Sequence, residues 1–242
     1  MIETGPRDDP RRLGQWLTGA GLALQVRRPH AGDPLPEQLD GYAALLVLGR
    51  GAEPDAPWLA SCESLLRKAV RSGVPTLGIG LGAHLLATAH GGVVAPAEAG
   101  PGIGPTLVAR RDAAGADPLF ADVPFTPDVV QWHRDELADL PLRAVLLAAS
   151  PRYAHQAFRL GAAAWGLLFH IEPDAAMVAD WVDEDRPLLA ELDLDPAAVV
   201  SAAAAVMDDL AEVWAPFAAR FAALARGEQT GTTRPELPIL PP

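Results

Sequence analysis

The sequence predicts an α/β domain built on a mostly parallel β-sheet with helices on both faces, followed by a C-terminal helical extension. Two apolar runs of strand length, residues 44–48 and 76–79, are each followed by a segment in which apolar residues recur at helical spacing. Strands that alternate with helices in this way form parallel sheets, because each helix returns the chain across one face. A chain of 242 residues is long enough to bury the core of one such domain.

The first half of the chain supplies this alternation. Residues 10–20 carry apolar side chains three and four positions apart, which predicts an amphipathic helix. After the strand at 44–48, residues 57–70 predict a helix with proline in its first turn. The strand at 76–79 runs through glycine into a third helix over residues 81–90. We therefore expect the strands at 44–48 and 76–79 to be parallel neighbours in the sheet.

The second half consists of short strands followed by helices. The expected strands are residues 106–110, 129–132, 144–149, 156–160 and 165–170. Residues 174–183 predict a helix, and an alanine-rich region begins at Asp195. It carries one long apolar stripe: Leu210, Val213, Trp214, Phe217, Phe221 and Leu224.

Proline inside this stripe and at the end of the chain sets the expected boundaries. Pro216 is predicted to kink or split the helix, because proline lacks the amide that the helix needs. We expect one domain over residues 1–190, a helical extension packed on it over 191–226, and a mobile tail over 227–242.

Composition and charge exclude several classes of function. The formal net charge of −12 argues against nucleic acid as a partner, because phosphate contacts are made mainly by lysine and arginine. No apolar run approaches the roughly 18 residues of a membrane span, and the N-terminus has no apolar signal core, so we expect a cytoplasmic protein that does not enter a membrane. The single cysteine, Cys62, excludes an internal disulfide and lies on the apolar side of its helix, as a core residue would.

Two histidines are candidates for chemistry. His170 ends the apolar run AWGLLFH, and Glu172 follows two residues later. Open α/β sheets bind ligands at this end of their strands, and a nearby carboxylate can orient an imidazole. The alternative is a histidine that simply faces solvent. His133 follows another strand in a polar segment, where it is either a site residue or an ordinary surface-loop histidine.

Glycine-rich turns follow the two central strands. Gly49-Arg50-Gly51 ends one strand and Gly80-Leu81-Gly82 ends the next. Backbone amides at such turns can form an oxyanion hole or bind an anion. Neither turn matches a phosphate-binding loop, and His84 and His90 are six residues apart, which is the wrong spacing for two metal ligands on one helix. We expect no metal and no cofactor.

Taken together, these segments resemble the class I glutamine amidotransferases, in particular stand-alone bacterial members related to the amidotransferase domain of GMP synthase. The resemblance rests on YAALLVLG, APWL, VPTLGIGLGAHLLATAHGG, VVQWHRDELADLP, AVLLAASPRYAHQAFRLG and AWGLLFHIE, in that order. It implies a flavodoxin-like α/β fold and a Cys-His-Glu triad whose cysteine attacks the side-chain amide of glutamine and releases ammonia.

The resemblance assigns roles to individual positions. It implies that His170 is the catalytic histidine, that Glu172 is the triad glutamate, and that Gly80 stands where the nucleophilic cysteine belongs. The oxyanion and ligand-binding positions that it implies are Gly49, Arg50, Leu81, His84, Trp132 and His133. It further implies that the His170 ring faces Gly80, within about 6 Å.

Several of these positions depart from the family pattern. Arg50 replaces a glycine and puts a long cation near the expected oxyanion site, and His84 and Leu168 replace glutamines. The apolar first strand of the family is reduced to Met1 and Ile2. Because several positions around the pocket have changed, natural loss explains Gly80 better than an engineered substitution.

Three hypotheses follow. The first is a pseudo-amidotransferase that binds a small molecule in the former glutamine pocket, or a protein partner. The second is a repurposed enzyme in which His170 and Glu172, with His133, carry out acid–base chemistry in that pocket. The third is an ordinary glutamine amidotransferase inactivated by a substitution at position 80.

Overall fold

The computed structural model describes residues 1–52 and 55–228. The strands are β1 (Ile2–Glu3), β2 (Leu45–Gly49), β3 (Thr76–Gly80), β4 (Val93–Pro96), β5 (Gly102–Leu107), β6 (Ala109–Arg110), β7 (Asp128–His133), β8 (Asp135–Asp139), β9 (Val145–Ala149), β10 (Ala157–Leu160) and β11 (Ala164–Leu167). The α-helices are α1 (Arg11–Gly19), α2 (Leu59–Ser72), α3 (Leu81–Thr88), α4 (Ala175–Glu184), α5 (Arg186–Glu191), α6 (Pro196–Ala205) and α7 (Met207–Ala225). Short 3-10 helices lie at Pro29–Ala31 and Asp112–Ala116.

The central sheet has seven strands in the order β1-β2-β3-β11-β10-β9-β6. β1, β2, β3 and β11 are parallel, whereas β10, β9 and β6 continue the sheet in antiparallel pairs. The predicted pairing of the two central strands is confirmed, with Leu45 opposite Thr76 and Gly49 opposite Gly80. Both glycine turns consequently lie at the same carboxyl-terminal edge of the sheet.

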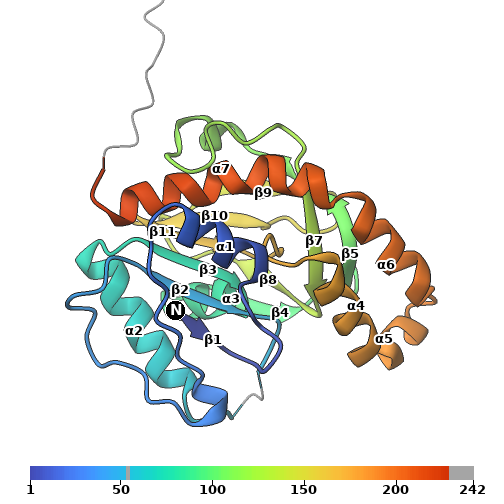
Figure 1. Ribbon diagram of the computed structural model, residues 1–242, viewed down its shortest axis with the longest axis horizontal. Helices are drawn as coiled ribbons and strands as arrows, with labels where there is room; N and C mark the ends of the chain where they lie inside the picture. Colours follow the sequence, from blue (N-terminus) through green and yellow to red (C-terminus); the bar gives the residue numbers. More distant parts are fainter. Residues whose placement is uncertain (53–54, 229–242) are drawn as a thin grey trace, which may run out of the picture.

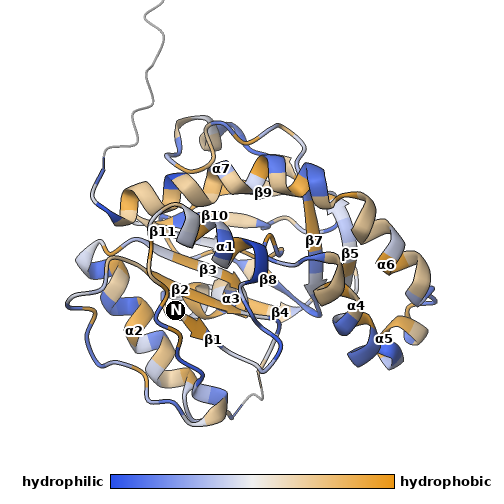
Figure 2. Cartoon of the chain, viewed as in Figure 1, coloured by the Kyte–Doolittle hydropathy of each residue, from blue (hydrophilic) through white to orange (hydrophobic). Residues whose placement is uncertain are grey.

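Helices cover both faces of this sheet (Figure 1). Alternate residues of β2 point to opposite sides, as they do in any strand. Leu45 and Val47 join a core formed with α2 and α3, and Leu46 and Leu48 join a larger core formed with α1 and α7. In Figure 2 the central strands are mostly hydrophobic, and α2 carries its hydrophilic residues on the outside. The fold is the flavodoxin-like α/β arrangement that the resemblance implies.

The second half of the chain differs from prediction in several strands. The single strand expected at 106–110 is two strands, β5 and β6, which belong to different sheets. β4 and β8 were not expected, and among the described strands each pairs with the other and with no third strand. The expected strand at 165–170 ends at Leu167, and His170 instead forms an isolated bridge with Val130. His133 is the last residue of β7 and does not lie in a polar loop.

Pro216 was expected to kink or split the C-terminal helix, and the split is wrong. α7 continues from Met207 to Ala225 with Pro216 inside it, and Figure 1 shows it crossing the sheet without a break. Buried aromatic residues on both sides of the proline, such as Trp214 and Phe221, pack into the larger core and compensate for the lost helical hydrogen bond. α7 shares the larger core with the sheet. The boundary between domain and helical extension at residue 190 stays a prediction. Residues 229–242 of the expected tail lie outside the described residues.

Candidate functional site

The turn from β3 into α3 is a sharp elbow made possible by glycine. Gly80 has φ 56° and ψ −114°, a backbone conformation that residues with a side chain rarely adopt. A β-carbon on Gly78 or Gly82 would collide with backbone carbonyls, of Gly82 and Val47 respectively. The glycines at 78 and 82 therefore allow the helix to approach the sheet, and Gly80 is at the corner.

His170 and Glu172 form a buried pair directly beside this elbow. The Nδ1 of His170 lies 2.5 Å from Oε1 of Glu172, and the other carboxylate oxygen accepts from the amide of Ile171 at 2.9 Å. Both side chains are at most 1% exposed, so the alternative of a solvent-facing His170 is wrong. Backbone hydrogen bonds between His170 and Val130 hold the ring in place.

The free nitrogen of His170 faces position 80. A β-carbon placed on Gly80 would lie 2.8 Å from Nε2 and 2.7 Å from Cε1 of His170, and closer still to the carbonyl oxygen of Gly49. His170 Nε2 is buried and has no hydrogen-bond partner among residues 1–52 and 55–228. The elbow, the histidine and the glutamate converge as a triad would, but the ring and the carbonyl have closed on the space that a nucleophilic side chain needs.

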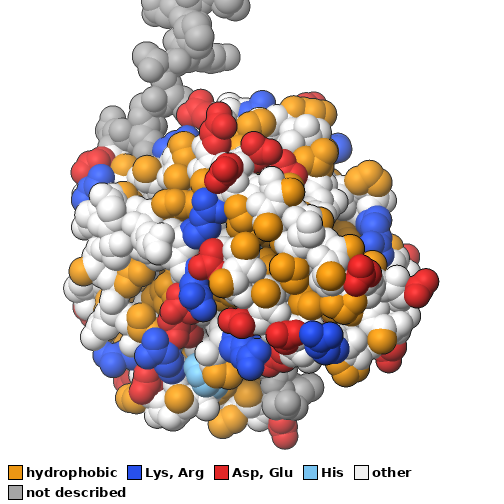
Figure 3. Space-filling model, turned by 45° about the vertical axis from the view of Figure 1, so that its right-hand side comes forward, with side chains coloured by type: hydrophobic (Ala, Val, Ile, Leu, Met, Phe, Trp, Pro, Cys, Tyr) orange, Lys and Arg blue, Asp and Glu red, His pale blue; other side chains and the backbone are white. Residues whose placement is uncertain are grey.

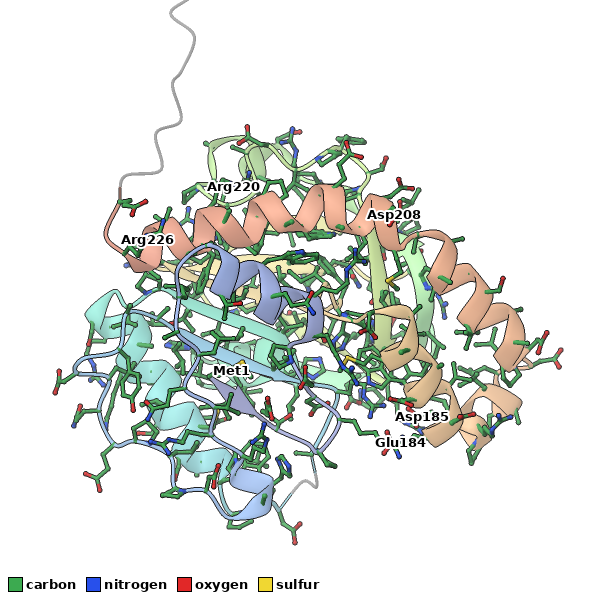
Figure 4. The ribbon with its side chains drawn as sticks, in the orientation of Figure 1. Met1, Glu184, Asp185, Asp208, Arg220 and Arg226 are labelled. Atoms are coloured by element: carbon green, nitrogen blue, oxygen red, sulfur yellow. The ribbon has the colours of Figure 1, made fainter. Side chains whose placement is uncertain are left out.

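Arg50 does not present a free cation to the elbow. Its guanidinium lies 2.5 Å from Glu184 and 3.3 Å from Asp185, at the junction of α4 and α5. It also stacks 5.0 Å from the ring centroid of Trp181, which in turn packs edge-on against His170. The long cation expected near the oxyanion site is thus directed to carboxylates, and Figure 4 labels both acidic residues at the end of α4.

The buried carboxylate of Asp8 also contacts Arg50. Asp8 lies 3.8 Å from Arg50 and accepts a hydrogen bond from Thr4. Burial raises the pKa of Asp8, and the nearby Arg50 acts in the opposite direction. Asp185 additionally accepts from the indole of Trp132 at 2.8 Å. Sequence reasoning did not find Asp8, Glu184 or Asp185, because acidic residues of this kind are abundant in the chain.

A cavity of about 1040 Å³ opens above the elbow. The predicted site residues that line it are Arg50, Leu81, His84, Trp132 and His133. Gly49, Gly80, His170 and Glu172 are not among its lining residues; Gly49 contributes the carbonyl that faces Gly80. Figure 3 shows acidic and basic side chains next to one another on the face that is turned forward, with a histidine among them.

His133 is held by a chain of buried amides. Its Nε2 lies 2.7 Å from Oε1 of Gln131, whose amide nitrogen donates to Gln156 at 2.6 Å. The ring also packs edge-on against Tyr153. His133 is 5% exposed, so the surface-loop alternative is wrong. Burial lowers its pKa to about 3, with a smaller contribution from His84.

His84 and Cys62 have contrasting positions. His84 lines the cavity, and burial lowers its pKa to about 4. Cys62 is fully buried in the smaller core, where burial raises the pKa of the thiol to about 12, as predicted for a packing residue.

In the described ranges no cluster of histidine, cysteine and carboxylate side chains has an arrangement that could hold a metal ion. Within the same ranges no helix has the length and apolarity to cross a bilayer.

Comparison with known proteins identifies the family. The sequence profile of the family described as glutamine amidotransferase class-I matches residues 15–174, more than half of the chain. The chain belongs to the class I glutamine amidotransferases. A crystal structure of a glutamine amidotransferase from Thermotoga maritima has a TM-score of 0.82 and 25% identity, covering 91% of this chain and 96% of that one.

Two curated relatives match over shorter stretches. Gamma-glutamyl peptidase 4 of Arabidopsis thaliana is 29% identical over 124 residues, which are 50% of this chain and 49% of that protein. The glutamine-hydrolysing GMP synthase of Thermomicrobium roseum is 38% identical over 120 residues, 50% of this chain and 21% of that protein. The match therefore spans about half of the first relative and about a fifth of the second.

Proposed function

We propose that this member of the family does not hydrolyse glutamine at an enzyme-like rate and serves instead to bind a small molecule in the cavity above the elbow. The observation that carries the proposal is the environment of Gly80. The resemblance places the attacking cysteine there, and glycine supplies no nucleophile for His170 to activate. Cys62 cannot replace it, because the thiol is buried in the core beneath a different helix and keeps its proton at neutral pH.

The packing at the elbow supports natural loss of the cysteine. If glycine replaced a cysteine in an otherwise intact site, the space of the thiol would be left empty. Here the ring of His170 and the carbonyl of Gly49 occupy that space. The remaining pair could give a residual rate over water of roughly 10³ to 10⁴-fold by analogy with triads that lack a member, which is far below the rate of the complete machinery.

The intact His170–Glu172 pair favours a second candidate function. Because Nδ1 of His170 donates to Glu172, Nε2 keeps a lone pair and could act as a general base. The candidate is hydrolysis of a γ-glutamyl amide by an activated water, and it requires the His170 ring to open toward the cavity, because Nε2 is buried and His170 does not line the cavity. The plant relative named gamma-glutamyl peptidase 4 makes γ-glutamyl dipeptides the appropriate substrates to test.

A protein partner is a further part of the proposal. The matched region of the Thermomicrobium roseum GMP synthase is only 21% of that protein, so the related segment there is one part of a longer polypeptide. We propose that the present chain can likewise work beside a second protein, with the cavity as the site of small-molecule binding.

One assay separates these functions. Purified protein is incubated with glutamine, and released ammonia is compared with a His170→Gln variant and with the Thermotoga maritima glutamine amidotransferase as a positive control. We expect the wild-type chain and the variant to give the same background. Ammonia release above the variant would overturn the proposed inactivity. Glutamate release from a γ-glutamyl dipeptide that is lost in both His170→Gln and Glu172→Gln would instead support the second candidate.

A further inference from the structure

Two stacked groups lie between the cavity and the buried ring of His170. Trp181 of α4 packs edge-on against this ring, with the ring centroids 5.1 Å apart, and both side chains are fully buried. The guanidinium of Arg50 lies 5.0 Å from the ring centroid of Trp181. Of these three residues only Arg50 lines the cavity. The order from the cavity inward is therefore Arg50, Trp181 and His170, and part of this cover must move before a molecule in the cavity can reach the ring.

Carboxylates at the corner between α4 and α5 fix the position of Arg50. Its Nη2 lies 2.5 Å from Oε2 of Glu184, and its Nη1 lies 3.3 Å from Oδ2 of Asp185. Figure 4 labels the two acidic residues side by side at this corner. The side chain of Glu184 is 43% exposed and that of Asp185 is 23% exposed, so solvent and salt screen the contact with Asp185 less.

Asp185 connects the cation to the aromatic layer. The carboxylate oxygen that contacts Arg50 also accepts from the indole nitrogen of Trp132 at 2.8 Å. Trp132 in turn packs against Trp181, with the ring centroids 5.3 Å apart. Because one oxygen receives both donors, removing its charge weakens both contacts at once. Arg134 lies 3.7 Å from Asp185 and is 60% exposed, so its contribution is smaller.

Asp185 makes these contacts in place of capping its own helix. It occupies the N-cap position of α5, where an aspartate usually accepts a hydrogen bond from a backbone amide of the first turn. Among the described residues, the Asp185 side chain makes no cap bond to α5. Its carboxylate is directed to Arg50 and Trp132 instead. A favourable local interaction has been given up for a tertiary one, which distinguishes this contact from a chance approach of surface charges.

We propose that Arg50 and Asp185 form a latch that keeps the His170 ring closed off from the cavity, and that the ring becomes accessible when this ion pair opens. The resemblance gives glycine at position 50, and glycine has no side chain with which to form such a latch. The latch requires no substrate and no reaction. It goes beyond the proposed function, and it holds whether or not the protein hydrolyses anything.

The experiment measures how fast diethyl pyrocarbonate modifies each histidine of the full chain, with the sites resolved by mass spectrometry of peptides. The reagent acylates an accessible neutral imidazole nitrogen, so the rate at His170 reports access to its ring. In the wild-type protein we expect His170 to react more slowly than the partly exposed His155. In Arg50→Gln and in Asp185→Asn the His170 rate should rise about tenfold or more, because loss of a charged hydrogen bond shifts an opening equilibrium by about that factor.

Asp183→Asn is the matched control. Asp183 lies two residues before Asp185, pairs with Arg186 where both side chains are more than 60% exposed, and is not a lining residue of the cavity. This variant should leave the His170 rate unchanged. His133 is the internal reference, because it is buried and held by Gln131 rather than by the latch, and its rate should stay low throughout.

Three results would overturn the latch. The first is an unchanged His170 rate in either Arg50→Gln or Asp185→Asn, since each variant removes one partner of the same ion pair. The second is an equal rise at His133, which would show that the whole site loosens. The third is the same rise in Asp183→Asn. Ammonia release from glutamine bears on the proposed inactivity alone and leaves this test unaffected.

Discussion

Restoring the missing thiol is the most informative perturbation of this protein. A side chain at position 80 must adopt φ 56° and ψ −114°, which costs about 1–3 kcal/mol for a residue other than glycine. Its β-carbon would also overlap the ring of His170 and the carbonyl of Gly49, and overpacking of this kind costs about 1–3 kcal/mol. Gly80→Cys should therefore lower the free energy of unfolding by about 2–6 kcal/mol.

Thermal unfolding and ammonia release measure the two consequences. Each kcal/mol shifts the Tm of a domain this large by roughly 2–4 °C, so the Tm of Gly80→Cys should fall on the order of 10 °C. Gly51→Ala is the matched control, because it borders the same cavity, meets no atom within 4 Å of a new β-carbon, and should change stability by less than about 0.5 kcal/mol. We expect Gly80→Cys to release no ammonia from glutamine, because the Gly49 carbonyl is backbone and cannot move aside cheaply. A Tm within about 2 °C of wild type together with glutaminase activity would refute this reasoning.

Two further predictions concern buried polar groups. Burial lowers the pKa of His133 to about 3 and that of His84 to about 4. As the pH drops below 6.5, these histidines bind protons in the unfolded chain but not in the folded one, so the free energy of unfolding falls. Between pH 7.5 and 5.5 each histidine should cost about 1.4 kcal/mol, and denaturant titration of His133→Gln should show that share of the pH dependence removed; an unchanged dependence would contradict the burial argument. Asp117→Ala should cost about 3–5 kcal/mol, because this 1% exposed carboxylate accepts from Arg159 at 2.8 Å and from Trp165 at 3.1 Å. The control Asp122→Ala removes an exposed partner of Arg220 and should cost less than about 1 kcal/mol. If urea titrations gave the two variants the same loss of unfolding free energy, Asp117 would contribute no more than a surface charge.

The β-strands illustrate how far pattern alone reaches. β2 and β3 are continuous apolar runs ending in glycine. Strands buried on both faces consist almost entirely of apolar residues, so the pairing of β2 and β3 could be predicted. β8 pairs with β4 in a two-stranded ribbon. Its sequence, DELAD, carries too little apolar periodicity to be recognised as a strand. Pro216 was predicted to kink or split a helix that tertiary packing keeps continuous.

The sequence by itself determined the α/β class, the sharp turn at Gly80, and the residues that the family resemblance assigns to the site, because apolar period, glycine position and motif order are local properties of the chain. Only the tertiary structure decided how those residues meet. Whether His170 and His133 face solvent or the interior depends on strands that pair across long sequence separations, such as the bridge from Val130 to His170. The direction of Arg50 depends on carboxylates more than 130 positions away, at Glu184 and Asp185, and no local pattern records which distant charge a long, flexible side chain will reach.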